Sequence, residues 1–378
     1  MIKNANGRNY PHITAAIAFL LILLFTQGLA LASQENLVYT AISNSDFGSC
    51  FSVSDDLFII RGSDRESQSD WLSLINVDGE SKWQYSSQEG TLFRHMFLLN
   101  QTAYISIGQW GVHPYDQETE LVPVDLSGEA TSPISLPNWI GSAYPIVMEK
   151  GVLFSGVYER DEKHYLKLAM YDKEFKLLWE TSTTKKLFPA NLILKCISMD
   201  DGFVVCGSNH TNQTSSLAKF DLNGKLSWSK TYKLKAEAKD LALWGDHFIV
   251  LGDRINAIKE HGSEFLFALD SKGKILWERK LTEDDGSITL NEIVACSDGY
   301  LLTGSRGCNP LALTLDDQCQ TLDIVDFPYV IDFMSKFIFA DDNKLFLFGL
   351  NVNDAGTTDG IICYEMFEKN TSWLEKIM

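Results

Sequence analysis

The phrase DLNGKLSW, at residues Asp221 to Trp228, returns almost unchanged as DSKGKILW at residues Asp270 to Trp277. Each copy follows an apolar run that ends in glycine, and seven such runs follow the N-terminal segment. The period is about 48 residues, which is typical of propellers and solenoids, whose repeats bury their faces against their neighbours. The glycines that end the runs are Gly62, Gly108, Gly156, Gly207, Gly252, Gly304 and Gly349.

The sixth repeat shows what each unit contains. Residues 292–296 and 300–303 are short β-rich runs around a Ser-Asp-Gly turn, and residues 310–315 and 321–325 form a second pair around Asp316. Four short strands separated by turns, with little helical periodicity, form a propeller blade when they are repeated radially. The sequence therefore predicts an all-β fold, a seven-bladed β-propeller with four antiparallel strands per blade. Each blade is expected to hold its own four strands, the last of them at residues 372–377.

The repeated phrase has a mechanical interpretation. Its Asp is expected to accept hydrogen bonds from its own turn, and its glycine to adopt a positive φ. The tryptophan four residues after the glycine falls on the fourth strand, where a large ring can cover the seam between two blades. Two turns keep only the Asp, at Asp172 and Asp316, and the tryptophan is replaced by Ser132 and Asp323 in the second and sixth repeats.

The phrase D-x-x-G-K-x-x-W at Asp221 and Asp270 resembles the docking motif of the quinoprotein-alcohol-dehydrogenase-like (PQQ-like, WD40-type) β-propeller superfamily. That superfamily includes PQQ enzymes and non-enzymatic relatives in outer-membrane assembly, and the longer pattern is similar to uncharacterised secreted bacterial propellers. The resemblance spans residues 43–378 and implies a propeller; because the motif is structural, it implies little about activity. PQQ enzymes usually have eight blades and a vicinal cysteine pair. The sequence shows neither, so we expect no PQQ and no other cofactor.

The N-terminal segment is expected to direct export. Lys3 and Arg8 precede the apolar run Ile13 to Ala32, which ends in a small-x-small pattern before Ser33. Residues 1–32 are therefore interpreted as a signal peptide, with an uncleaved membrane anchor as the alternative. Residues 33–42 form an N-terminal arm, in which residues 37–40 could pair with the last blade and help to close the ring. Residues 43–378 form the propeller, which is expected outside the cytoplasm, secreted or on the cell surface.

Charge and cysteine content limit the partners. The formal net charge of −18 disfavours nucleic acids and anionic membranes, and we expect a monomer that touches a membrane only through an uncleaved N-terminal segment. Cys196 and Cys206 flank a turn and could face each other across a hairpin, as could Cys308 and Cys319. The alternative is that most cysteines are small buried residues.

No nucleophile elbow, phosphate loop, EF-hand loop or pair of metal-binding histidines is found, so no metal site is expected. Acidic pairs such as Asp200-Asp201 are interpreted as turn residues. Variation should gather in the loops after the second strands and between the blades, which share one face of a propeller. The residue two positions after each repeated glycine is polar or aromatic, and these residues are the candidate ligand-binding set: Asp64, Trp110, Tyr158, Asn209, Arg254, Arg306 and Asn351.

The function that these observations favour is a non-enzymatic binding or scaffold module, which would recognise a protein, peptide or glycan through that face. The alternative is an extracytoplasmic enzyme that acts on glycans, a hydrolase or lyase, with a PQQ-type dehydrogenase as a distant third. An enzyme would need carboxylates or a histidine that converge near the axis of the propeller. The residues available for that are Asp64, Asp253, Arg254 and Arg306.

Overall fold

The computed structural model divides into two units, residues 1–37 and 38–378, and nearly all of what it describes belongs to the second. The predicted signal peptide, residues 1–32, lies outside the described residues. No helix among the described residues is long and apolar enough to cross a membrane. The described ranges are 37–40, 45–54, 57–64, 68–76, 80–109, 118–140, 144–160, 163–184, 188–190, 192–209, 211–234, 236–253, 264–281, 288–296, 299–307, 309–316, 318–326, 331–339, 345–352 and 358–366.

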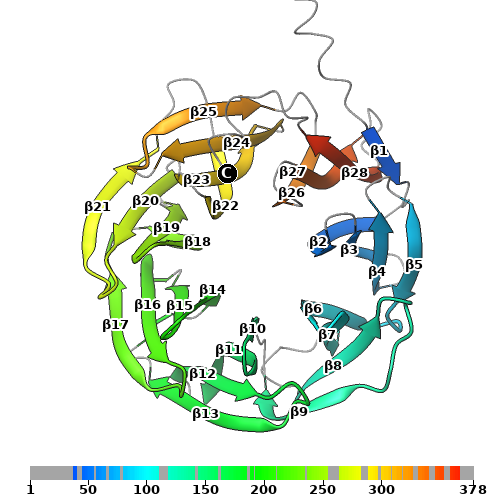
Figure 1. Ribbon diagram of the computed structural model, residues 1–378, viewed down its shortest axis with the longest axis horizontal. Helices are drawn as coiled ribbons and strands as arrows, with labels where there is room; N and C mark the ends of the chain where they lie inside the picture. Colours follow the sequence, from blue (N-terminus) through cyan, green and yellow to red (C-terminus); the bar gives the residue numbers. More distant parts are fainter. Residues whose placement is uncertain are drawn as a thin grey trace, which may run out of the picture. The chain divides into compact units, whose positions relative to one another are not determined.

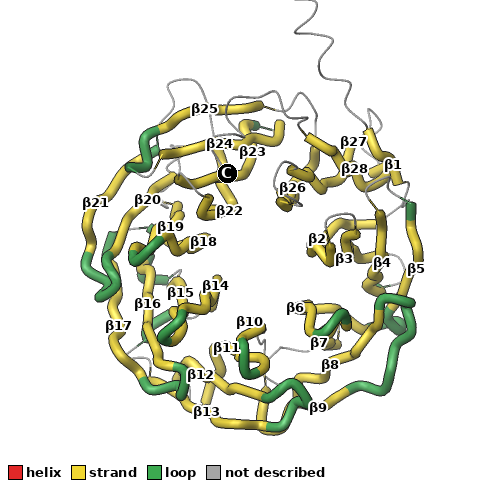
Figure 2. The backbone as a smooth tube through the Cα atoms, in the orientation of Figure 1, coloured by secondary structure: helices red, strands yellow, loops and turns green. Residues whose placement is uncertain are grey.

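The second unit is a β-propeller built from antiparallel four-stranded sheets, with one edge strand of each sheet innermost in the ring (Figure 1). Figure 2 shows strands joined by loops and no helix in the described part of the chain. Each sheet packs against the next, and the first packs against the last through β2 and β26, so the sheets form a closed ring. Four-stranded antiparallel sheets are thus confirmed.

Six blades consist of four consecutive strands each, paired in chain order. Blade 1 comprises β2 (Ser45–Ser54), β3 (Leu57–Asp64), β4 (Ser69–Asn76) and β5 (Ser81–Ser86); blade 2 comprises β6 (Thr91–Leu99), β7 (Thr102–Gln109), β8 (Glu118–Asp125) and β9 (Ile134–Ile140); blade 3 comprises β10 (Tyr144–Met148), β11 (Gly151–Arg160), β12 (Lys163–Tyr171) and β13 (Leu177–Thr184). Blade 4 comprises β14 (Leu192–Met199), β15 (Gly202–Asn209), β16 (Thr214–Asp221) and β17 (Leu226–Tyr232); blade 5 comprises β18 (Glu237–Trp244), β19 (His247–Asp253), β20 (Glu264–Leu269) and β21 (Ile275–Lys280); blade 6 comprises β22 (Ile288–Cys296), β23 (Gly299–Arg306), β24 (Asn309–Asp316) and β25 (Thr321–Asp326).

The remaining sheet is composite. Its strands are β26 (Ile331–Phe339), β27 (Leu345–Val352), β28 (Thr358–Met366) and, beside β28, the N-terminal strand β1 (Leu37–Thr40). The prediction of seven blades with four strands of their own is therefore wrong, because six blades meet that description. The last repeat lacks the Asp and Gly that turn a third strand into a fourth, and an unpaired edge of β28 would expose backbone donors and acceptors. The predicted pairing of residues 37–40 with the last sheet is confirmed; residues 372–377 lie outside the described residues.

The turn between the third and fourth strands has the predicted chemistry. In blade 4, Asp221 Oδ1 accepts hydrogen bonds from the backbone N–H of Asn223 and of Lys225, both at 2.9 Å. The corresponding Asp of blades 2, 3, 5 and 6 makes the same pair of bonds. Gly224 has a φ of +76°, a conformation that a side chain disfavours. The hydrogen bonds that define this hairpin turn therefore involve only residues of the turn itself.

The tryptophan on the fourth strand docks on the turn of the following blade, as predicted. Trp228 Nε1 donates to the carbonyl oxygen of Ser271 at 3.0 Å, and its ring lies where a Cβ on Gly273 would have to be. Trp83 makes the same contact with the turn of blade 2, through the carbonyl oxygen of Leu126 at 2.9 Å. The glycine therefore serves both the turn and the seam between the blades.

Blade 3 shows how the ring tolerates the loss of this contact. Ser132 replaces the docking tryptophan of blade 2, and the turn of blade 3 carries Phe175, with a φ of +60°, where blades 1, 2, 4 and 5 carry glycine. The Phe175 ring packs against Tyr104 and Phe97 of blade 2, at centroid distances of 4.7 and 6.3 Å. An aromatic ring from the turn thus replaces an aromatic ring from the strand at the same seam.

The repeated glycine on the second strand sits beside an irregularity of the innermost strand. In four sheets it pairs with the residue directly before a bulge of that strand, as Gly252 does with Ala238 and Gly304 with Leu290. A Cβ at position 304 would lie 1.9 Å from the carbonyl oxygen of Thr289. The glycine is therefore needed because two backbones approach closely.

The hydrophobic core lies in the layers between adjacent blades. Phe203 and Phe220 of blade 4, for example, stack at 5.3 Å and pack with Leu153 and Leu168 of blade 3. Similar clusters join blades 4 and 5, and blades 5 and 6. This arrangement buries both faces of a blade, which accounts for the near-continuous apolar runs of the second and third strands.

The cysteine pairing expected in blade 4 is wrong. Cys196 is opposite Val205, and Cys206 is opposite Lys195, so the two cysteines are offset by one residue on neighbouring strands. A one-residue offset places their side chains on opposite faces of the sheet, and both are free thiols. Burial raises the pKa of both thiols far above its ordinary value. Cys308 lies outside the described residues.

Candidate functional site

The predicted ligand-binding set is defined by its position at the end of the second strands, and the structure places its members there. Asp64, Asn209 and Arg306 are the last residues of β3, β15 and β23, and Tyr158 and Asn351 lie near the ends of β11 and β27. Trp110 and Arg254 lie outside the described residues, as do the side chains of Asp64, Tyr158 and Asn351. The set therefore marks one end of the ring, which we call the loop face: the end that carries the connections between second and third strands and between blades.

Asn209 is held beneath the loop face and does not project from it. Its side chain is buried; Nδ2 donates to the carbonyl oxygen of Pro189 at 2.8 Å, and Oδ1 accepts from the backbone N–H of Asn212 at 3.1 Å. One amide group thus ties the connection into blade 4 to the loop between β15 and β16. Asn209 positions two other residues, Pro189 and Asn212, and both of these line a pocket.

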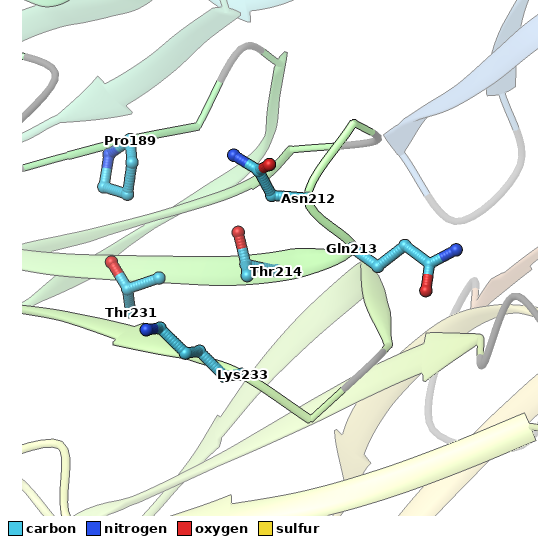
Figure 3. A pocket seen from close by; sticks show the side chains of 6 residues that line it. All are labelled: Pro189, Asn212, Gln213, Thr214, Thr231 and Lys233. Atoms are coloured by element: carbon cyan, nitrogen blue, oxygen red, sulfur yellow. The ribbon is translucent and has the colours of Figure 1, made fainter.

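That pocket is a hollow on the loop face of blade 4, with a volume of about 400 Å³ (Figure 3). Four of its six lining residues carry an amide or hydroxyl group, carbon atoms supply more than half of its surface, and Lys233 supplies a positive charge. These groups come from the connection before β14, the loop between β15 and β16, and the end of β17, so the pocket combines three segments. Its lining residues are Pro189, Asn212, Gln213, Thr214, Thr231 and Lys233.

The sequence prediction found the end of the blade where the pocket lies but missed the residues that line it. Thr231 and Lys233 alternate around the buried Tyr232 at the end of the fourth strand, so they face away from the core. That alternation is the only sequence signal for them, and it is shared by every outer strand. The wall of the pocket could be recognised only once the loop residues were seen to approach β17.

Charged side chains of the inner strands connect one blade to the next. Lys195 Nζ of blade 4 lies 2.7 Å from Asp240 Oδ1 of blade 5, and Asp240 Oδ2 accepts from the backbone N–H of Ile293 in blade 6 at 2.8 Å. A single carboxylate therefore links three blades. Because Asp240 is nearly buried, removing either partner would leave an uncompensated charge or donor.

Two further carboxylates form a related inter-blade contact. Glu264 of blade 5 accepts from the backbone N–H of Leu290 at 2.9 Å, and Lys239 Nζ lies 2.9 Å from it. Asp70 of blade 1 accepts from the N–H of Phe93, and Arg61 donates to it at 3.1 Å. Burial raises the pKa of both carboxyl groups, although the adjacent cation opposes this in each case. These charged groups stabilise the packing of neighbouring blades.

The sequence predicts no metal site and interprets the acidic pairs as turn residues. In the described part of the chain, no group of three or more His, Cys, Asp or Glu side chains is arranged to hold a metal ion. Asp201, from one acidic pair, lies in the turn between β14 and β15 and accepts from Lys219 Nζ at 2.8 Å. That contact is consistent with its interpretation as a turn residue.

Comparisons with known proteins identify the fold. No family model and no curated protein sequence matches the chain. Among solved structures, the β-propeller domain of the trilobed protease from Pyrococcus furiosus, described as having an open velcro topology, has a TM-score of 0.54 at 12% identity over 90% of this chain and 98% of that one. A prolyl endopeptidase has a TM-score of 0.51 at 12% identity, over 87% of this chain and only 50% of its own length. The protein is thus a β-propeller, and these likenesses do not single out the PQQ-like superfamily.

Proposed function

We propose that this protein is an exported, non-enzymatic binding module that recognises a protein, peptide or glycan through its loop face. The pocket of blade 4 carries this proposal, because it lies on the face that sequence variation between the repeats predicts for binding and three separate segments build it. Four of its six lining residues carry an amide or hydroxyl group on a surface that is more than half apolar, which favours a ligand that makes hydrogen bonds and also presents apolar surface.

The arrangement of the inner charges is consistent with this proposal. Asp70, Asp240 and Glu264 each accept a backbone N–H of the next blade, and each has a cation beside it. These contacts give the groups a structural role. Asp253, one candidate for an enzyme, lies 3.8 Å from Lys239 Nζ, so it belongs to the same charge network. The glycan-acting enzyme therefore has no observation of its own in the described residues.

Two parts of the proposal rest on sequence alone. Export depends on the segment at residues 1–32, and membership of the PQQ-like superfamily depends on the phrase at Asp221 and Asp270. Mass spectrometry of the N-terminus of protein purified from its native cells tests export. Cleavage after residue 32 supports it, and an intact N-terminus in the cytosolic fraction contradicts it.

Binding is tested by comparing variants on the loop face with a control variant on the opposite face of the propeller. Immobilised wild-type protein is screened against peptide and glycan arrays and against native extracellular material. Lys233→Glu and Asn212→Ala are then compared with Lys150→Glu, which reverses an exposed charge in the turn between β10 and β11 on the other end. Loss of the captured ligand in the first two variants only supports the loop face. Equal capture by all three variants, or no ligand in any screen, contradicts it.

A further inference from the structure

Arg94 stands out among the charged residues of the inner strands because its guanidinium has no partner among the described residues. It lies in the bulge of β6, between Phe93 and Met96, and is half-buried. No hydrogen bond or ion pair of its guanidinium is found in the described structure, and burial alone lowers its pKa. A half-buried guanidinium without acceptors is costly unless something supplies them.

The corresponding bulge of blade 5 shows the contrast. Lys239, in the bulge of β18, has Glu264 at 2.9 Å and Asp253 at 3.8 Å, and it also donates to the carbonyl oxygen of Leu290. Two carboxylates therefore lie beside the cation of blade 5, whereas no carboxylate of the described residues contacts that of blade 2. In a chain with a net charge of −18, an unpaired cation in this position is notable.

The groups around Arg94 do not offset its charge. Arg61 donates to the backbone carbonyl oxygen of Arg94 at 3.0 Å, and its own guanidinium is paired with Asp70. The pKa of His95 is lowered to about 4 by burial and by the charges of Arg61 and Arg94, so this ring is neutral near pH 7. Asp70 thus offsets the charge of Arg61, and among the described residues no carboxylate is found beside the guanidinium of Arg94.

Gly108 provides room for the Arg94 side chain. A Cβ on Gly108 would overlap the guanidinium, since its nearest atoms would be the Nε, Nη2 and Cζ of Arg94. Gly108 is the second-to-last residue of β7, at the loop-face end of the strand. The guanidinium therefore lies toward the loop face. His95 follows Arg94 in the sequence, and its ring packs against that of Tyr144 in blade 3, with the two centroids 4.2 Å apart.

We propose that Arg94 is a binding site for a carboxylate group of a small ligand or of a ligand terminus. A planar guanidinium binds a carboxylate through two parallel hydrogen bonds, and the half-buried position strengthens such a pair. The strongly acidic surface repels extended polyanions, so a single carboxylate beside otherwise neutral groups is the chemistry that fits. The inference rests on the proposed function, because it names the chemistry that the loop face recognises.

The probes separate the two sources of such a carboxylate. Isothermal titration calorimetry is carried out with N-acetylglycine and its amide, which represent a peptide C-terminus, and with glucuronate and glucose, which represent an acidic sugar. Binding of one acid and not of its neutral counterpart identifies the source. Inorganic phosphate is the third probe, and preferential binding of phosphate over both acids would overturn the assignment to carboxylates.

The variants test the residue. Arg94→Gln should weaken binding of the preferred acid at least ten-fold, Arg94→Lys should weaken it less, and Arg279→Gln, on the outer strand β21, should leave it unchanged. Gly108→Ala should weaken it as well, because it displaces the guanidinium without removing it. In the wild type, the Arg94 Nε–Hε NMR signal should shift on titration, a readout that needs no variant. Unchanged binding in Arg94→Gln, an unmoved signal, or no binding of any acid would each overturn the proposal.

The two proposals fail in different ways. If the acids do not bind but a larger ligand is still captured through Lys233 and Asn212, the Arg94 site is wrong and the loop face stands. If the acids bind at Arg94 but neither array nor native material yields a ligand, the anion site stands and the proposed function is wrong.

Discussion

Replacing Gly273 by alanine separates the two roles of the repeated glycine. Gly273 has a φ of +70°, and a Cβ there would lie 2.9 Å from the Trp228 ring and 3.0 Å from the Tyr232 hydroxyl. Gly245, in the turn between β18 and β19, has a φ of +60° and nothing within 4 Å of the same Cβ. Gly245→Ala therefore measures the backbone cost alone, and Gly273→Ala adds the seam between blades 4 and 5.

The expected difference follows from this geometry. A left-handed alanine costs about 1–2 kcal/mol at either position. At position 273, displacing the Trp228 ring adds about 1–3 kcal/mol of overpacking, and weakening the Trp228 Nε1 hydrogen bond to Ser271 adds about 1 kcal/mol. We expect Gly245→Ala to lower the free energy of unfolding by about 1–2 kcal/mol and Gly273→Ala by about 3–6 kcal/mol.

Urea denaturation, followed by tryptophan fluorescence and circular dichroism, measures both variants against the wild type. The midpoints give the change in stability if the slopes are equal. Trp228→Phe in the Gly273→Ala background should recover part of the loss, because a smaller ring leaves room for the methyl group. Equal destabilisation by the two alanine substitutions would refute the claim that the glycine is needed at the seam.

Three further predictions concern buried groups. Asp240→Ala should lower the free energy of unfolding by about 1.5–3 kcal/mol, since it removes charged hydrogen bonds to two other blades. The control Asp201→Ala removes an exposed ion pair and should lower it by less than about 0.5 kcal/mol. Equal effects of the two substitutions in urea denaturation would contradict the inter-blade role of Asp240. Because burial lowers the pKa of His95 to about 4, the contribution of its neutral ring to stability is fully present above pH 6.5 and is lost as the pH falls toward 4. The urea midpoint should therefore fall more between pH 7 and pH 5 in the wild type than in His95→Gln, and parallel pH profiles of the two proteins would contradict this prediction. Iodoacetamide should label Cys206, whose pKa burial raises, only after unfolding, as mass spectrometry can check, and rapid labelling of the native protein would show that the thiol is accessible.

Much of the fold was predictable because the turns and strands of each blade depend mainly on residues within the same repeat. The Asp221 turn needs only residues up to Lys225 for its hydrogen bonds, and Trp228 follows at a constant distance along the chain. Such local chemistry is visible as a repeat. The pairing of residues 37–40 with the last sheet was predicted too, but the place directly beside β28 was assigned to residues 372–377, whereas the structure puts β1 there. A local repeat does not determine which of two distant segments pairs with an edge strand.

The candidate site was predictable only as a position. Counting two residues from each glycine located the loop face, and one of the predicted residues, Asn209, proved to organise the pocket from below. Lys233 and Arg94 were not found. Lys233 directly follows β17 and Arg94 lies on β6, and each is distinguished by what does or does not approach it from other segments of the described chain.

By itself, the sequence determined the antiparallel strands, the turns and the tryptophan seams of this protein, because those features depend on contacts within one repeat or at a constant spacing. The tertiary structure alone decided that β1 lies directly beside β28, that Asp240 links three blades and that, among the described residues, Lys239 has carboxylate partners while Arg94 has none. Those outcomes depend on which side chains meet across a seam, and the energy of a buried charge is set by its neighbours in space and not by its neighbours along the chain.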